Sequence, residues 1–398
     1  MVFLFILYLV WVVYTSILLS RKGRFYIFSP FVVVYLGFAV SDIIPLLMYD
    51  SAGSLPSNIP FVTNWATIIN FVMIILFRKD FFKKMDISPP SQIRIYNNRR
   101  KVLIISFLLI LVGAGIYSGV TISILSGGNV ENLRRTSEIG MGFITMIPYF
   151  AIFLLILQML FCSPKISIFQ AGLICFIVSV LLFFTNAARA QFVMGISVFF
   201  IWFNIKYRAL KWYEYYVLFY LLSPIVATFL LVFRGEGGAF NINEILFAHQ
   251  NMIFLMNTKS LMTYFDGSNG YLMGMSYIFP ITTFIPRFLW AEKPLSIDYY
   301  YKEITGMDFD GGGIYTTLSM EMYLNFGQYF MFFYAIWLLF IHFLYRKALS
   351  ENTNYTYRIS LMYFLTLFVA PDHMIAKLEV YILFLIICRW YYGKKRII

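Results

Sequence analysis

Charged residues and cysteines are scarce in this chain. Only 13% of its 398 residues are Asp, Glu, Lys or Arg, against about 25% in an ordinary soluble domain. The three cysteines, Cys162, Cys175 and Cys388, show no paired spacing, which argues against a disulfide framework and against a cysteine metal site. We therefore expect all three to be packing residues.

Sequence motifs for cofactors and metals are also missing. There is no P-loop, dinucleotide fingerprint or serine elbow in a supporting context. His249, His342 and His373 lie far apart, and the stretch DFDGGG at 308–313 lacks the later ligands of a calcium loop. These absences predict a protein that uses neither a cofactor nor a metal.

Apolar residues dominate instead, at 61% of the chain. Many apolar runs approach or exceed the roughly 20 residues that cross a bilayer as a helix. The runs are continuous rather than alternating, which favours helices over a barrel of strands. We predict an all-α polytopic transmembrane helical bundle of about eleven (10–12) spans, forming a single membrane-embedded domain over residues 1–398.

The predicted spans cover residues 2–20, 27–48, 62–77, 102–124, 142–162, 167–185, 191–205, 215–233, 329–345, 359–371 and 378–390. The first run has no basic residue before it, and RKGR follows it. That polarity is wrong for a cleaved signal peptide, so we expect this run to be the first span.

Lys and Arg gather in alternate connections between the spans. One set of connections, with its flanking residues, holds 22 of the 31 Lys and Arg residues but only 4 of the 19 Asp and Glu residues. Because basic connections face the cytoplasm, this set and the C-terminus are predicted to be cytoplasmic, and the N-terminus external. The net charge of +12 is then a topology signal, and we expect no nucleic-acid partner.

The longest connection, residues 234–328, is predicted to face outward and to bear short helices; connections of this length are usually functional. Arg189, Arg234 and Arg287 each lie at the abrupt end of an apolar run, at the depth of lipid headgroups. Charges there are costly and indicate a functional site, although a single arginine can also merely reach to lipid headgroups. With Arg135 and Lys293, these arginines would suit a diphosphate, since guanidinium groups pair bidentately with phosphate oxygens.

Two outward positions are candidate general acids or bases. Glu321, in LSMEMYLNFG, lies on an apolar stretch entering a late span, where a desolvated carboxylate accepts a proton more readily. Asp372 and His373 form a short external corner in FVAPDHMIAK. The alternatives are a carboxylate paired with an arginine for packing in the first case, and an ordinary turn after proline in the second.

Two motifs, IPRFLWAEKP (285–294) and GGGIYTTLSMEMYLNFG (311–327), together resemble the bacterial oligosaccharide repeat-unit polymerases, the Wzy-type O-antigen and capsule polymerases. The matching residues are Pro286, Arg287, Trp290, Lys293 and Pro294 in the first motif, and Glu321, Tyr323, Asn325, Phe326 and Gly327 in the second. An external N-terminus with an odd span count departs from the many relatives that have twelve spans and both ends inside.

The resemblance implies a GT-C-like, metal-independent glycosyltransferase in the bacterial cytoplasmic membrane, with its active site facing the periplasm. Such enzymes transfer a growing glycan from undecaprenyl diphosphate to the terminal sugar of another lipid-linked repeat unit, for O-antigen or capsular polysaccharide. The expected partners are these lipid-linked oligosaccharides, the bilayer and a chain-length regulator protein. The expected roles are catalytic for Glu321, Arg287, Asp372 and His373, diphosphate-binding for Arg135, Arg189, Arg234, Arg287 and Lys293, and substrate-binding for Trp290, Tyr315, Tyr323 and Asn325.

Two other functions remain open at this point. An O-antigen ligase would need the same diphosphate-binding arginines and a large late loop, usually with a histidine, and only His249 is available there. A lipid-linked oligosaccharide flippase or other transporter would place ionisable residues within its spans. Asp42 is nearly the only such charge deep in a predicted span.

Overall fold

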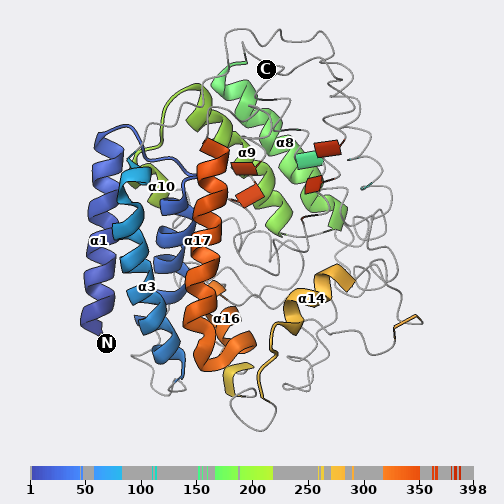
Figure 1. Cartoon of the computed structure of the whole chain (residues 1–398). Coiled ribbons are helices and arrows are strands. Elements are labelled where there is room, and N and C mark those ends of the chain that lie inside the picture. Colours follow the sequence, from blue (N-terminus) through green and yellow to red (C-terminus); the bar gives the residue numbers. More distant parts are fainter. Residues whose placement is uncertain are drawn as a thin grey trace, which may run out of the picture. The chain divides into compact units, whose positions relative to one another are not determined.

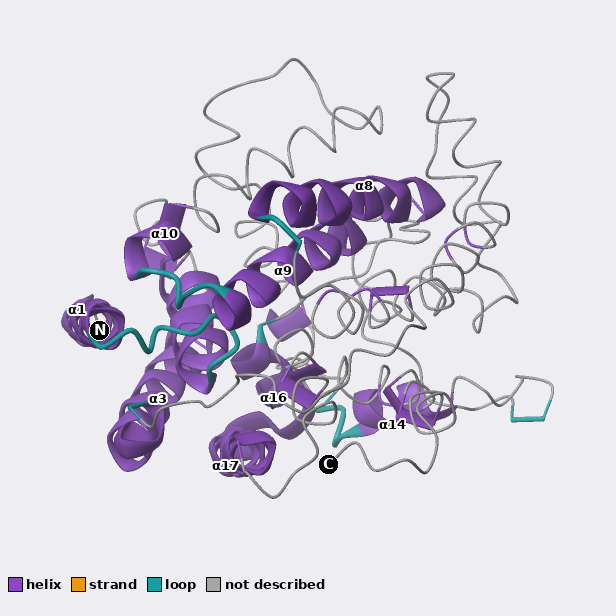
Figure 2. Cartoon of the chain, turned by 90° about the horizontal axis from the view of Figure 1, so that it is seen from above, coloured by secondary structure: helices purple, strands orange, loops and turns teal. Residues whose placement is uncertain are grey.

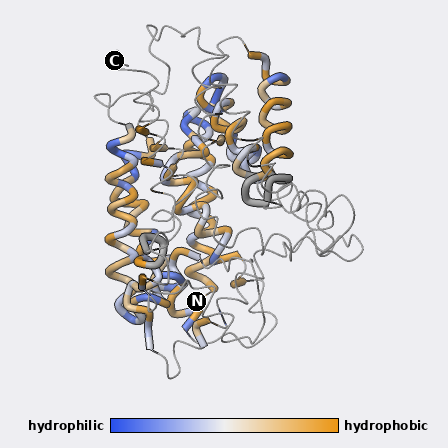
Figure 3. The backbone as a smooth tube through the Cα atoms, turned by 90° about the vertical axis from the view of Figure 1, so that its right-hand side faces the viewer, coloured by the Kyte–Doolittle hydropathy of each residue, from blue (hydrophilic) through white to orange (hydrophobic). Residues whose placement is uncertain are grey.

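The computed structural model describes residues 2–44, 46–47, 58–82, 166–186, 189–217, 270–282, 289–290 and 317–349, together with scattered further positions. These residues are mainly helical and include no strand, which confirms the predicted all-α class for this part of the chain (Figures 1 and 2). Three helical stretches, Val2–Arg21, Asn58–Phe81 and Leu318–Ala348, are long and apolar enough to cross a membrane. Figure 3 shows apolar residues along most of the length of the described helices. These features are compatible with a membrane protein.

Several predicted spans coincide with helices of nearly the same bounds. These helices are α1 (Val2–Arg21), α3 (Asn58–Phe81), α8 (Ile168–Asn186) and α9 (Arg189–Lys206). The predicted spans 102–124, 142–162, 215–233, 359–371 and 378–390 lie mostly outside the described residues. The full number of spans therefore stays a prediction.

The chain divides into two compact units. Unit 1 comprises Met1–Met85, Ile245–Ser350 and Leu361–Lys377, and unit 2 comprises Asp86–Glu244, Glu351–Ser360 and Leu378–Ile398. The predicted outward connection 234–328 lies largely in unit 1, where α14 (Met275–Thr282) is one described short helix of it.

Unit 1 is built on α1, α3 and α17 (Phe330–Leu349). Contacts between α3 and α17 advance together along both helices, from Phe61 with Phe330 through Asn70 with Tyr334 and Phe77 with His342 to Asp80 with Arg346. The two helices therefore run parallel. Large buried aromatic side chains fill the space around them and α1, including Phe5, Tyr8, Tyr35 and Phe330.

The basic ends of these three helices lie together. Each has Lys or Arg in its last turn, and Arg346 donates from Nε (2.8 Å) and Nη2 (2.6 Å) to Asp80 at the end of α3. Lys22, just after α1, lies over the ring of Phe82, 4.7 Å from its centroid. The described part of the predicted cytoplasmic set in unit 1 is thus gathered at one end of that unit (Figure 1).

The predicted span 27–48 contains π-helical turns, η1 (Phe31–Leu36) and η2 (Ala39–Ile43). The ring of Tyr8 on α1 meets Phe38 edge to face, and its hydroxyl donates to the carbonyl of Tyr35 at 3.0 Å. Turns of this kind are rare and occur frequently at functional sites. Asp42 lies in the second of them.

The predicted span 329–345 corresponds to α17, but a separate short helix precedes it. This helix, α16 (Leu318–Phe326), ends at Gly327, where the one-turn 3₁₀ helix η6 (Gly327–Tyr329) begins. Gly327 has φ 56° and ψ −136°, a backbone conformation that residues with a side chain rarely adopt. A Cβ at this position would also collide with the ring of Tyr271. The glycine thus lets α16 fold back against α17 and α3.

In unit 2, α8 and α9 form an antiparallel pair. Gly195 allows the close approach, because a Cβ there would collide with Ser179. Near the other end of the pair, the hydroxyl of Tyr207 donates to the carbonyl of Ile166 at 3.4 Å. Cys175 is buried in α8 and free, which confirms its packing role, whereas Cys162 and Cys388 lie outside the described residues.

Candidate functional site

A buried carboxylate meets the start of α16 in unit 1. Asp42 is 5% exposed. Its Oδ1 accepts hydrogen bonds from Thr317 Oγ1 at 2.7 Å and from Ser319 Oγ at 2.5 Å, and its Oδ2 accepts one from Ser41 Oγ at 2.7 Å. Thr317 immediately precedes α16 and Ser319 lies in its first turn. The carboxylate is therefore fixed at the N-terminus of this helix, where the helix dipole favours a negative charge.

Glu321 follows in the same turn and is 1% exposed. Its backbone N–H donates to the carbonyl of Thr317 at 2.9 Å, and its own carbonyl accepts a hydrogen bond from Asn325 Nδ2 at 2.9 Å. Because α16 packs against α3 and α17, this glutamate lies within the protein rather than facing lipid. The carboxyl group is thus enclosed by protein and shielded from bulk water.

The second half of α16 is tied to residues 271–276, which precede and begin α14. Ser276 Oγ donates to Asn325 Oδ1 at 2.9 Å, and the backbone N–H of Met273 donates to the carbonyl of Asn325 at 2.7 Å. The hydroxyls of Tyr271 and Tyr323 are 3.4 Å apart. Tyr323 and Asn325, predicted to bind substrate, are both buried in these contacts and support the helix that carries Glu321.

The other predicted site residues are placed as follows. Trp290 is 39% exposed in unit 1, and Arg189 is the first residue of α9 in unit 2, where only its backbone is described. The predicted residues Arg135, Arg234, Arg287, Lys293, Tyr315, Asp372 and His373 lie outside the described residues. The structure therefore brings together Glu321, Tyr323 and Asn325, on one helix.

The sequence shows Asp42 as a charge deep in a predicted span, but nothing in it connects Asp42 with α16. The available signal was a carboxylate inside an apolar run, because such a charge needs partners nearby. Asn70 on α3 is a second buried polar residue: its Oδ1 accepts a hydrogen bond from Tyr334 at 3.2 Å, and its Nδ2 has no partner among the described residues.

The buried histidine of α17 belongs to the packing near the basic end of unit 1. His342 Nε2 is 2.6 Å from the hydroxyl of Tyr35, and its ring stacks on Phe77 with centroids 3.9 Å apart. Among the described residues, no group of three or more His, Cys, Asp or Glu side chains could hold a metal ion.

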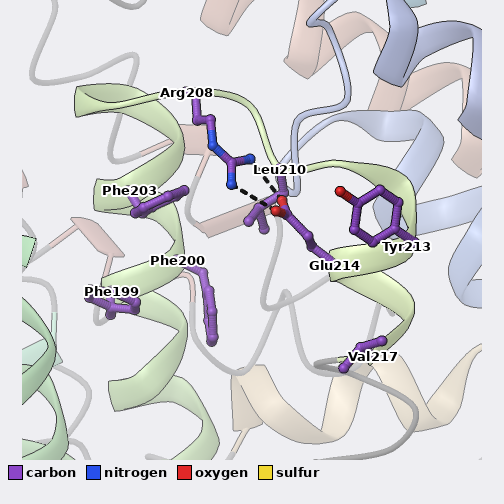
Figure 4. A pocket seen from close by; sticks show the side chains of 8 residues that line it. All are labelled: Phe199, Phe200, Phe203, Arg208, Leu210, Tyr213, Glu214 and Val217. Carbon is purple, nitrogen blue, oxygen red and sulfur yellow. Dashed lines mark hydrogen bonds and ion pairs between the residues drawn. The ribbon is translucent and has the colours of Figure 1, made fainter.

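A pocket of about 410 Å³ lies in unit 2 between α9 and α10 (Trp212–Tyr216) (Figure 4). Most of its lining is apolar: Phe199, Phe200, Phe203, Leu210, Tyr213 and Val217, with Arg208 and Glu214 at one side. Those two charges pair bidentately, at 2.8 and 2.7 Å, so they neutralise each other. The pocket therefore offers no net charge from its own lining to an anionic ligand.

The same ion pair holds the connection between α9 and α10. Glu214 Oε2 also accepts the backbone N–H of Lys211 at 2.8 Å, half of a capping box at the start of α10. The guanidinium of Arg208 is the main cause that lowers the pKa of Glu214, and the Lys211 N–H adds to it. The pair is partly exposed, so its contribution to stability is modest.

We expect Glu214→Gln to lower the free energy of unfolding by about 0.5–1 kcal/mol at pH 7. Because the pKa is lowered in the folded state, this contribution is present above the unfolded pKa, about 4.3. It disappears as the pH falls through the lowered pKa. Thermal melts of both proteins from pH 7 to pH 3 should therefore converge in acid, with the exposed Lys79→Gln variant as the control. A gap that persists or widens in acid would contradict this assignment.

Comparisons with known proteins do not assign the chain to a family, because no protein-family model, no curated protein and no solved structure matches it.

Proposed function

We propose that this chain is a metal-independent membrane glycosyltransferase that polymerises undecaprenyl-diphosphate-linked oligosaccharide repeat units for O-antigen or capsular polysaccharide. The observation that carries the proposal is the enclosure of Glu321 in unit 1, on a short helix anchored at both ends. This glutamate belongs to the motif that resembles repeat-unit polymerases. Active sites that exclude bulk water strengthen electrostatic interactions and prevent side reactions, and a general base there must lie within hydrogen-bond reach of the sugar hydroxyl.

We place this site at the outer face of the bacterial cytoplasmic membrane. Phe61, near the start of α3, contacts both Phe330, the first residue of α17, and Tyr323 on α16. The site therefore lies toward the helix ends opposite the basic ones. Because basic ends face the cytoplasm, the Glu321 end faces outward, where lipid-linked repeat units are assembled into polymer.

In the proposed reaction, the acceptor sugar hydroxyl attacks the anomeric carbon of the glycan on the donor lipid. A bond forms between that oxygen and the anomeric carbon, and the bond from the anomeric carbon to the diphosphate oxygen breaks. Glu321 takes the hydroxyl proton, and undecaprenyl diphosphate leaves with the bonding electron pair. A single displacement of this kind inverts the anomeric configuration.

The leaving diphosphate gains negative charge in the transition state. Cations already in place around it would lower the barrier because they bind the transition state more strongly than the ground state. We assign this role to Arg287 with Arg135, Arg189, Arg234 and Lys293, from their positions in the sequence.

A transporter of lipid-linked oligosaccharides is the second candidate. The observation that favours it is Asp42, because a carboxylate buried within a spanning segment is typical of transport pathways. Its three hydroxyl donors and its place at a helix N-terminus, however, satisfy it within the protein. We therefore rank transport below polymerisation.

Deleting the gene in a cell that makes the polymer separates the candidates. Loss of a polymerase leaves a single repeat unit attached to the lipid A core. Loss of a ligase leaves polymer that is not attached, and loss of a transporter leaves repeat units on the cytoplasmic face with none at the surface. The first pattern supports the proposal and either of the others contradicts it.

We expect Arg287→Ala to abolish long polymer, because it removes a cation from the leaving group, and Arg287→Lys to restore part of it. The measurement is the ladder of chain lengths on a gel, from cells that express each variant at the wild-type level. Partial rescue by lysine would mean that the charge matters more than the planar fork. A normal ladder from the stably expressed alanine variant would refute the role.

A further inference from the structure

We propose that Asp42 is a positioning residue, which holds the N-terminal end of α16 and thereby sets the place of the Glu321 carboxyl group. The effect of Asp42 on catalysis rests on the proposed function. Asp42 does not take part in the proposed reaction, and it comes from η2, a part of the chain far from α16 in sequence.

The hydrogen bonds show how Asp42 acts on α16. A threonine before a helix usually caps that helix by accepting a backbone N–H with its own oxygen. Thr317 makes no such bond, and its hydroxyl donates to Asp42 instead. Ser319 donates to the same carboxylate oxygen. Among the described residues, the side chain of Asp42 thus binds the start of α16 from outside the helix.

Electrostatics agree with an anchoring role rather than a cation site. The positive end of the α16 dipole already faces the Asp42 carboxylate and disfavours a bound cation there. The three hydroxyls all direct their hydrogens at the carboxylate. A cation would need the same oxygens to turn their lone pairs inward, which would break all three hydrogen bonds.

The position of Glu321 on α16 makes this anchor important. The C-terminal half of the helix is held through Asn325, by Ser276 and by the backbone of Met273. Glu321 lies between that anchor and Ser319, on a helix of only nine residues. Among the described hydrogen bonds, those of Asp42 hold the N-terminal end of the helix from outside, so loss of Asp42 weakens the hold on the turn that carries Glu321.

The test compares Asp42→Ala and Asp42→Asn with Thr15→Ala, which removes a buried hydroxyl of α1. We expect Asp42→Ala to lower kcat on a lipid-linked repeat unit about 100-fold, the cost of a displacement of roughly 1 Å. Asp42→Asn, which keeps an oxygen acceptor, should lose about tenfold by the same reasoning. Both variants should keep the fall in rate at low pH, because that fall reflects protonation of Glu321. Thr15→Ala should keep wild-type kcat.

A double substitution tests the contact itself. Ser319→Ala should lower kcat in the wild-type protein but cause no further loss in Asp42→Ala, because the two act through one hydrogen bond. If Asp42→Ala does not fold, the double variant Thr317→Val with Ser319→Ala removes the two donors of α16 instead. It should show the same loss of kcat with an unchanged fall in rate at low pH.

A measurement that does not depend on enzyme activity, the chemical labelling of Glu321, distinguishes this proposal from the proposed function. Dicyclohexylcarbodiimide labels carboxyl groups in membrane proteins, and peptide mapping locates the label. Glu321 should react slowly in the wild-type protein and several times faster in Asp42→Ala or in the Thr317→Val with Ser319→Ala variant. If the wild-type protein makes no polymer but this difference appears, the proposed function fails and the anchor stands.

Two outcomes would overturn the inference. Wild-type kcat together with unchanged Glu321 labelling in Asp42→Ala would show that α16 does not depend on Asp42. Loss of the fall in rate at low pH in Asp42→Asn would show that Asp42 itself exchanges a proton with the substrate, which is a catalytic role rather than a positioning one.

Discussion

Glu321→Gln is expected to lower the rate of polymerisation on the order of 10²–10⁴-fold, the usual contribution of a general base. The amide keeps the shape of the side chain and its buried position but cannot accept the proton of the sugar hydroxyl. The measurement is kcat of the purified variant on a lipid-linked repeat unit, together with the polymer ladder of cells that express it.

Glu214→Gln is the matched control for this prediction. It is the same chemical change in unit 2, at a partly exposed ion pair far from α16 in sequence, and it should leave the polymer ladder unchanged. Glu321→Asp should retain part of the rate, because it keeps the base on a shorter side chain. Polymer of normal length from a stably expressed Glu321→Gln variant would rule out the base.

Gly327→Ala is expected to destabilise the protein and to displace α16. A backbone in this region costs a residue with a side chain about 1–3 kcal/mol. The added methyl group would also collide with the ring of Tyr271, at a further cost of about 1–3 kcal/mol. Thermal unfolding of the purified variant should show a clearly lower Tm, and the polymerisation rate should fall with it because Glu321 moves.

Gly23→Ala separates the two causes. Gly23 also has a positive φ, 62°, but a Cβ there would meet nothing within 4 Å. The free energy of unfolding of this variant should therefore fall only by the cost of the positive φ, about 1 kcal/mol, and its activity should stay normal. Equal losses of stability in the two variants would show that the contact with Tyr271 does not matter.

Much of the described helical structure could be predicted from the sequence. Apolar runs followed by basic residues predicted α1 as 2–20 and α3 as 62–77, close to Val2–Arg21 and Asn58–Phe81. Both helices end in basic turns, which mark the change from an apolar to a polar environment. Hydropathy did not give the π-helical turns of residues 31–43, because it reports how apolar a segment is and not how its backbone winds.

The candidate site could be predicted only in part. The motif pointed to Glu321, and the structure places this residue inside the protein with Tyr323 and Asn325 on the same helix. The contact between Asp42 and Ser319 joins residues 277 positions apart in the chain. Neither hydropathy nor local spacing reports such a pair. The predicted span began at residue 329, close to the first residue of α17, but hydropathy gave neither the separate helix α16 nor the backbone conformation of Gly327.

Purified full-length protein in liposomes, given a defined undecaprenyl-diphosphate-linked repeat unit in the presence of a chelator, tests the central claim most directly. The account predicts a ladder of longer glycans and one released undecaprenyl diphosphate for each new bond, with both lost in Glu321→Gln. A repeat unit that is bound or carried across the bilayer but never lengthened would contradict it.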